Sequence, residues 1–171
     1  LPGAPPVWRD AVRGKIRPLR LWRSGIRTKQ EQMPAVGSDD EKVLAQIREL
    51  DGFEFERLSV AIVDLIPEVI PGLIHKVEQT KLVGDRGLDM FGYFKMPEPI
   101  SYVIPFKGEA KNWGSAVQPK EVSRLVSRLQ RGEHGLFFTT SWYTDQAQDE
   151  VLKDSYPVRL FSGLDIVDLL R

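Results

Sequence analysis

The chain has 171 residues, of which 42% are hydrophobic and 28% are charged, a composition that is typical of a folded protein and excludes a disordered or fibrous one. It has no cysteine, which excludes thiol nucleophiles, disulfide frameworks and cysteine-ligated zinc. Because the sequence has no run of about 18 apolar residues and no signal-peptide core, we expect no membrane partner and a cytoplasmic location.

The net charge is zero, but the charges are unevenly distributed along the chain. Residues 1–37 contain eight basic and two acidic residues, whereas the 134 residues that follow contain 16 basic and 22 acidic ones. A basic segment beside an acidic body is expected either to contact a polyanion such as DNA or to be a solvated linker. The chain starts at Leu1 rather than Met, and we expect it to be a piece of a longer protein.

The first 37 residues contain five prolines and no sustained apolar period, so we predict an irregular arm or linker over 1–37 and a compact domain over 38–171. Ser38 and Glu41 have the S-x-x-E spacing of a capping box, which predicts a helix start at this point. The apolar residues of this helix are Val43, Leu44, Ile47 and Leu50. A second helix is predicted after Asp51-Gly52, and its apolar residues are Phe55, Leu58, Ile62 and Leu65.

Three strands are predicted in the middle of the chain. The hydrophobic period changes to two over residues 77–83, as in a half-exposed strand. Residues 88–94 and 101–111 are predicted to form two further strands, because the prolines of the loop between them, Pro97 and Pro99, disfavour a helix. We therefore expect an antiparallel β-meander over this part of the chain.

Helices and strands alternate in the last third of the chain. Pro119 suits the first turn of a helix, and an apolar stripe continues from there to Gly132. We predict short buried strands at 136–140 and 158–161, a polar helix at 144–153 and a terminal helix at 164–170. The whole order, α-α-β-β-β-α-β-α-β-α, predicts an α/β fold in which helices flank a mixed β-sheet.

The feature that points to chemistry is an aspartate in one strand of the predicted hairpin and a Glu-Ala-Lys run in the other. Residues two apart in a strand share a face, so Glu109 and Lys111 should project together while Ala110 points into the core. A hairpin centred on residue 99 pairs positions whose numbers sum to 198, and this register places Asp89 opposite Glu109.

Two facing carboxylates repel each other unless a cation or a proton lies between them. Carboxylate ligands without His or Cys favour Mg²⁺ or Mn²⁺ over zinc. On this view, removal of Asp89 relieves the repulsion and is expected to favour thermal stability. The alternative interpretation is an ordinary solvent-facing pair of carboxylates that Lys111 bridges.

Five short blocks follow one another between residues 51 and 170: Phe55-Glu56-Arg57-Leu58, Gly84-Asp85-Arg86-Gly87-Leu88-Asp89, Gly108-Glu109-Ala110-Lys111, Gly135-Leu136-Phe137-Phe138-Thr139-Thr140-Ser141 and Leu164-Asp165-Ile166-Val167-Asp168-Leu169-Leu170. In this order they resemble the Mrr-like catalytic domain of restriction endonucleases, within the PD-(D/E)XK nuclease superfamily. The resemblance implies a restriction-endonuclease-like α/β sandwich.

The resemblance also implies roles for single residues. Asp89 matches the metal-binding aspartate, Glu109 the second acidic ligand and Lys111 the catalytic lysine. Glu56 matches an acidic position that some members use as an auxiliary metal ligand. Two departures stand out, because Leu88 replaces a proline and Glu109 stands where many Mrr-like members carry Gln. The chain therefore looks closer to restriction enzymes with a Glu-Ala-Lys site.

The function implied by the resemblance is that of a Mg²⁺-dependent endonuclease, with Mn²⁺ as a substitute, which hydrolyses phosphodiester bonds of double-stranded DNA. Cleavage of both strands usually needs two such sites, so a homodimer or two successive nicks are expected. A separate target-recognition domain or subunit is a further expected partner. The basic face of the helix after Pro119 is the predicted DNA contact, through Lys120, Arg124 and Arg128.

Two alternatives stay open from the sequence. A junction-resolving or repair nuclease would share the fold and the site but recognise the shape of the DNA. A non-catalytic DNA-binding module would keep the fold and bind DNA without metal-dependent cleavage. A complete set of Asp89, Glu109 and Lys111 argues against the second alternative, because a binding module has no need of repelling carboxylates.

Overall fold

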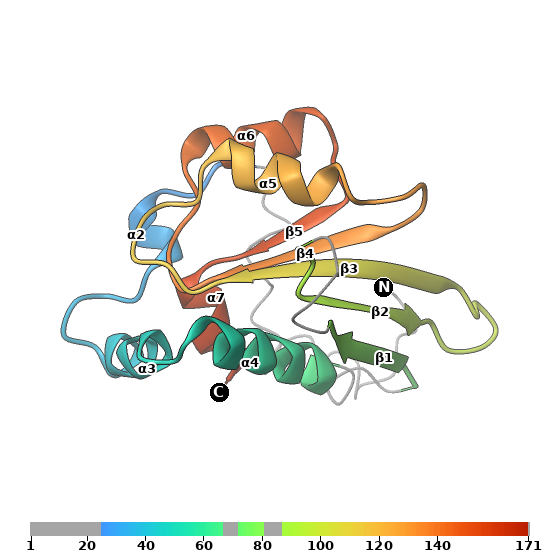
Figure 1. Ribbon diagram of the computed structural model, residues 1–171, viewed down its shortest axis with the longest axis horizontal. Helices are drawn as coiled ribbons and strands as arrows, with labels where there is room; N and C mark the ends of the chain where they lie inside the picture. The colour runs from blue at the N-terminus through green and yellow to red at the C-terminus, as the bar shows by residue number, and fades with distance from the viewer. Residues whose placement is uncertain (1–24, 67–71, 81–86, 171) are drawn as a thin grey trace, which may run out of the picture.

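The computed structural model describes residues 25–66, 72–80 and 87–170 (Figure 1). The predictions for residues 1–24, for the strand end at 81–83 and for the turn at 84–86 lie outside these ranges. Among the helices of the described ranges, none has the length and apolar character needed to cross a membrane.

In the described ranges, five strands form one sheet in which the spatial order equals the chain order. They are β1 (Ile74–Gln79), β2 (Met90–Lys95), β3 (Val103–Lys111), β4 (His134–Thr139) and β5 (Val158–Phe161). The first three strands pair antiparallel, and β3, β4 and β5 pair parallel. The parallel half follows from the helices that connect β3 to β4 and β4 to β5, because parallel strands need crossover connections. The predicted mixed sheet is confirmed.

Helices cover both faces of this sheet (Figure 1). One face carries α3 (Asp39–Arg48), α4 (Gly52–Leu65) and α7 (Gly163–Leu169), and the other carries α5 (Pro119–Val126) and α6 (Asp145–Lys153). Each face has its own apolar core. The core under α3, α4 and α7 includes Leu44, Phe55, Phe106, Ala110 and Ile166, and the core under α5 and α6 includes Val122, Leu125, Phe137, Ala147 and Leu160.

Side-chain caps start α3 and α4 at the predicted points. Ser38 Oγ accepts a hydrogen bond from the amide of Glu41 at 3.1 Å, and Asp51 Oδ1 accepts one from the amide of Glu54 at 2.8 Å. The capping box predicted at Ser38 is half formed, because the Glu41 carboxylate accepts from the amide of Gly37 rather than from that of Ser38. Each such cap typically contributes about 1 kcal/mol.

The β2–β3 hairpin has the predicted register. Met90 pairs with Gly108 and Lys95 pairs with Val103, so the paired numbers sum to 198. Gly108 lets the strands approach closely, because a Cβ at this position would lie 2.6 Å from the Met90 side chain. Ala110 is buried in the core under α4, as predicted. The hairpin therefore brings Asp89 and Glu109 to the same end of the sheet.

Residues 25–37, the described part of the predicted arm, contact the C-terminal elements. They include a short helix, α2 (Lys29–Gln32). The Arg27 guanidinium binds both carboxylate oxygens of Asp165 at 2.9 Å. The buried Gln32 side chain donates to the carbonyl of Tyr143 at 3.0 Å and accepts from its amide at 2.9 Å. These contacts tie the segment to α7 and to the chain after β4, while the domain boundary at Ser38 stays a prediction.

Candidate active site

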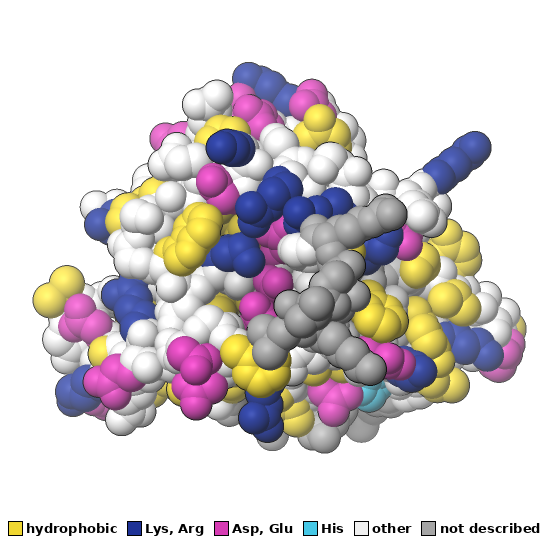
Figure 2. Space-filling view, in the orientation of Figure 1, with side chains coloured by type: hydrophobic (Ala, Val, Ile, Leu, Met, Phe, Trp, Pro, Cys, Tyr) yellow, Lys and Arg dark blue, Asp and Glu magenta, His cyan; other side chains and the backbone are white. Residues whose placement is uncertain are grey.

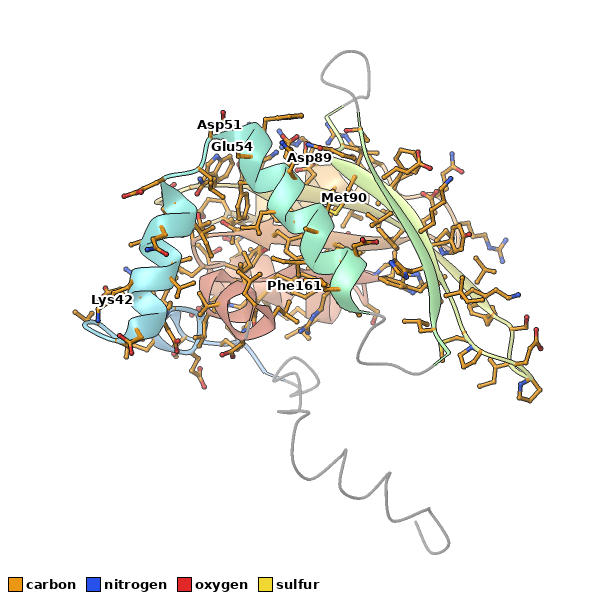
Figure 3. The ribbon with its side chains drawn as sticks, turned by 90° about the horizontal axis from the view of Figure 1, so that it is seen from below. Lys42, Asp51, Glu54, Asp89, Met90 and Phe161 are labelled. Carbon is orange, nitrogen blue, oxygen red and sulfur yellow. The ribbon has the colours of Figure 1, made fainter. Side chains whose placement is uncertain are left out.

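The site begins with Asp89, which directly precedes β2. Its amide donates to the carbonyl of Gly108 at 3.0 Å, which extends the hairpin by one bond. Its Oδ2 accepts hydrogen bonds from the amide of Ala110 at 2.7 Å and from Lys111 Nζ at 3.1 Å. The residue is only 7% exposed. Seen from below the sheet, Asp89 lies beside the N-terminal half of α4 (Figure 3).

Lys111 is the last residue of β3 and turns its ammonium group back toward Asp89. Its Nζ also donates to the carbonyl of Ala110 at 3.2 Å. Asp89 and Lys111 are both largely shielded from water, with side chains 10% and 18% exposed. The interpretation of Asp89 and Glu109 as solvent-facing carboxylates therefore does not describe this structure.

Glu109 is fully buried, and two arginines bind its carboxylate. Arg124 Nη2 donates to Oε2 at 3.0 Å, and Arg128 Nη1 donates to Oε1. Arg128 also donates to the carbonyl of Gly87 at 2.9 Å. The hydrogen bond to Glu109 raises the pKa of Arg124, so this guanidinium stays charged. A buried carboxylate requires such compensation, because an unpaired one is strongly destabilising.

Glu56 of α4 lies near this cluster, as the family resemblance implies. Gln79 of β1 donates a long hydrogen bond to Glu56 Oε2 at 3.4 Å. Burial and then the negative charge of Asp89 raise the pKa of Glu56. The structure thus brings a third carboxylate to the side of Asp89 that faces α4.

Replacement of Glu56 by glutamine is expected to raise the melting temperature at neutral pH. The raised pKa means that the folded state holds the proton more tightly than the unfolded state, so the free energy of unfolding falls as the pH rises through that pKa. Thermal unfolding of the variant and the parent should show the gain at pH 7 and its decline as the pH is lowered toward 4.5.

Glu49→Gln serves as the control for this measurement, because it removes an exposed carboxylate just after α3. It is expected to show no comparable gain that depends on pH. A Glu56→Gln protein that melts below the parent at pH 7 would contradict a pKa of Glu56 raised by burial and by the charge of Asp89.

The predicted DNA-contact residues separate into two groups. Arg124 and Arg128 reach inward to Glu109, and their side chains are 46% and 23% exposed. Lys120 lies in the first turn of α5 and is exposed. Figure 2 shows Lys and Arg side chains gathered beside Asp and Glu side chains near the middle of one face of the molecule. Basic and acidic groups therefore share one surface region.

Sequence reasoning missed two features of the site. It did not identify Gln79, whose only signal was its place in an alternating strand. It assigned Arg124 and Arg128 to DNA and not to Glu109, although their spacing of four residues places both on one face of the predicted helix. In the structure α5 ends at Val126, and Arg128 lies just after it. Within the described ranges, no group of three His, Cys, Asp or Glu side chains forms a ready-made metal cluster.

Comparisons with known proteins identify the family and the fold of the chain. Residues 47–170 match the family model of the Mrr catalytic domain, which is described as a restriction endonuclease. None of the curated proteins compared with the chain matches it.

Two solved structures share the fold. One is the MspJI restriction endonuclease in complex with a 27-mer oligonucleotide. Its sequence is 30% identical, its TM-score is 0.75, and the match covers 86% of this chain and 34% of the MspJI chain. The other is the DNA modification-dependent restriction endonuclease AspBHI. Its sequence is 35% identical, its TM-score is 0.72, and the match covers 98% of this chain and 44% of the AspBHI chain. The chain thus spans less than half the length of either protein.

Proposed function

The chain belongs to the Mrr-like catalytic family of restriction endonucleases, and from this membership we propose that it is a Mg²⁺-dependent endonuclease that hydrolyses phosphodiester bonds of duplex DNA. The observation that carries the proposal is the pair of buried carboxylates, Asp89 and Glu109, at one end of the hairpin. Lys111 pairs with the first carboxylate, and Arg124 and Arg128 pair with the second. Catalytic sites for phosphoryl transfer combine such carboxylates with cations.

The donor set fits a hard divalent cation. Carboxylate oxygens without His or Cys suit Mg²⁺ or Mn²⁺, and Asp89 and Glu109 would hold the ion, with Glu56 as the auxiliary ligand. Both principal carboxylates are shielded from water, and each has a positive group as its partner. Carboxylates in such a place are stable only beside positive charge, which a metal ion would also supply.

Each protein group has a role in the proposed hydrolysis. When bound, the divalent cation supplies a Lewis acid for the scissile phosphate and lowers the pKa of a bound water. The Lys111 ammonium, which Asp89 and the Ala110 carbonyl hold in place, is the group available to orient that water or to stabilise the charge that develops on the phosphate. The exposed parts of Arg124 and Arg128 supply positive charge for the DNA backbone.

The substrate and partners are proposed on the same grounds. The MspJI structure is a complex with a 27-mer oligonucleotide, and AspBHI is described as DNA modification-dependent. We therefore propose double-stranded DNA as the substrate, with unmodified and methylated DNA both to be tested. A homodimer and a separate target-recognition domain or subunit belong to the same proposal, as does DNA contact by the basic arm and by Lys120.

The test is cleavage of supercoiled plasmid by the chain at increasing concentrations of Mg²⁺ or Mn²⁺, with EDTA and Ca²⁺ as comparisons. Nicking or linearisation is expected with Mg²⁺ and Mn²⁺ and should disappear in EDTA, because the ligands are carboxylates. Undiminished cleavage in EDTA would overturn the metal mechanism. DNA binding without cleavage in either metal would favour the non-catalytic binding module.

A second cleavage experiment distinguishes a restriction-type nuclease from a junction-resolving or repair nuclease. The chain is given linear duplex and a four-way junction of the same sequence, each methylated or unmodified. A restriction-type catalytic domain is expected to cut the linear duplex at least as well as the junction. Strong preference for the junction would favour the junction-resolving or repair nuclease.

A further inference from the structure

The two arginines on Glu109 use both oxygens of the carboxylate. Arg124 donates to Oε2 and Arg128 donates to Oε1, and Glu109 is fully buried between them and the sheet. Among the described residues, Asp89 forms its ion pair with a single cation, Lys111. Glu109 is therefore surrounded by two positive charges, which would repel a metal ion that approaches its carboxylate.

The same arginines also face outward. Arg124 is in α5, Arg128 follows the end of that helix, and both side chains keep part of their surface in solvent. Guanidinium groups bind carboxylates and phosphates with the same fork of N–H donors. A DNA phosphate that approaches this surface is thus a direct competitor of Glu109 for Arg124 and Arg128.

From these contacts we infer that Arg124 and Arg128 form an exchangeable clamp, which holds Glu109 in the DNA-free protein and passes to a DNA phosphate when DNA binds. The inference rests on the proposed function, because it concerns how that site becomes competent. Transfer of the clamp leaves the Glu109 oxygens free to act as metal ligands and removes two positive charges from their immediate surroundings. Metal and DNA should therefore bind with positive coupling.

The coupling is reciprocal by thermodynamic necessity, so DNA should raise the affinity for the metal by the factor by which the metal raises the affinity for DNA. Coupling of this kind is typically about 5–150-fold. A clamp that only positioned Glu109 for the metal would behave differently. Its removal would weaken metal binding, and any gain in metal affinity that DNA produces, for example through contact between the cation and a phosphate, would not depend on Arg124 and Arg128.

The first measurement uses the unaltered chain. Ca²⁺ binding is measured by calorimetry without DNA and with a saturating short duplex, because Ca²⁺ takes oxygen ligands and is expected to support binding more than cleavage. The clamp predicts an affinity at least about fivefold higher with DNA. Equal affinities in a chain that cleaves plasmid with Mg²⁺ would overturn the clamp and leave the proposed function intact. Absence of Ca²⁺ binding in both conditions together with absence of cleavage would overturn both.

The second measurement uses Arg128→Gln and Arg124→Gln. Each should raise the Ca²⁺ affinity of the DNA-free chain and reduce the gain that DNA produces, with the larger effect for Arg128, whose side chain is more buried. Arg131→Gln is the matched control, because Arg131 is an exposed arginine three residues after Arg128 and should leave the DNA-free affinity unchanged. Weaker Ca²⁺ binding in both folded clamp variants would overturn the inference.

Thermal unfolding checks each variant, because loss of Arg128 leaves Glu109 with one partner. If Arg128→Gln does not fold, the decision rests on Arg124→Gln and on the unaltered chain. Arg124 is the more exposed arginine, so its replacement disturbs less buried structure. A rise in DNA-free Ca²⁺ affinity in Arg124→Gln supports the clamp, and an unchanged or lower affinity counts against it.

Discussion

Replacement of Lys111 by alanine is expected to reduce plasmid cleavage by about 10²–10³-fold or more while metal binding persists, because loss of one charged contact in the transition state typically costs that much. The ammonium of Lys111 lies 3.1 Å from Asp89 Oδ2 and does not supply a ligand oxygen itself. Its removal leaves both carboxylates in place and takes a competing cation away from Asp89, so the affinity for Mn²⁺ should stay equal or rise.

Calorimetric Mn²⁺ binding and plasmid cleavage on the same protein check this result. Lys153→Ala is the matched control, because Lys153 forms an exposed ion pair with Asp149 on α6 and should leave both quantities unchanged. Cleavage at the parental rate by Lys111→Ala would show that the family role does not apply to this lysine. A parallel loss of Mn²⁺ binding would show that Lys111 holds the ligands in place rather than acting on the phosphate.

Local signals in the sequence were enough for most of the fold. The start of α4 follows from Asp51, whose side chain caps the helix, and the start of α5 follows from Pro119. The register of the β2–β3 hairpin follows from the position of its loop, and it places Ala110 in the core as expected. These features depend on neighbours within a few residues or on a simple period, which a single sequence displays.

The remaining features depend on contacts between distant parts of the chain. Helix α2 has four residues, and its Gln32 is held by Tyr143, which is 111 positions away. The burial of Glu109 under Arg124 and Arg128 depends on how α5 packs on the sheet. Helical spacing in the sequence predicts that the two arginines point to the same side, but the strand that they meet is set by tertiary packing.

The stability effect of Asp89 also depends on tertiary contacts. From the sequence, removal of one of two repelling carboxylates was expected to favour thermal stability. The contacts of Asp89 lead us to expect the opposite result, because Asp89 accepts a hydrogen bond from the buried amide of Ala110 and pairs with Lys111. Its loss leaves a buried donor without a partner and a partly buried ammonium without its counter-ion.

Two replacements of Asp89 are therefore expected to differ in stability but not in activity. Asp89→Asn and Asp89→Ala should both lose cleavage and bind Mn²⁺ more weakly, because each removes a ligand charge. Asp89→Ala should also unfold at a lower temperature, since an unsatisfied buried donor typically costs about 1–3 kcal/mol. Asp89→Asn keeps an oxygen that can accept from the Ala110 amide, so its melting temperature should stay closer to that of the parent.

The difference in melting temperature between Asp89→Asn and Asp89→Ala tests whether Asp89 is both a metal ligand and a partner of the Ala110 amide. Melting temperature, calorimetric Mn²⁺ binding and plasmid cleavage are measured on both, with Asp39→Asn as the control for an exposed aspartate paired with Lys42 on α3. If both Asp89 variants cleaved DNA at the parental rate, Asp89 would be a structural residue and the metal site would have to lie elsewhere. If Asp89→Ala were more stable than the parent, repulsion between the carboxylates would outweigh the contacts with Ala110 and Lys111. Loss of cleavage in both variants, with a lower melting temperature mainly in the alanine variant, is the result expected of a metal ligand that also ties the end of β3 to the start of β2.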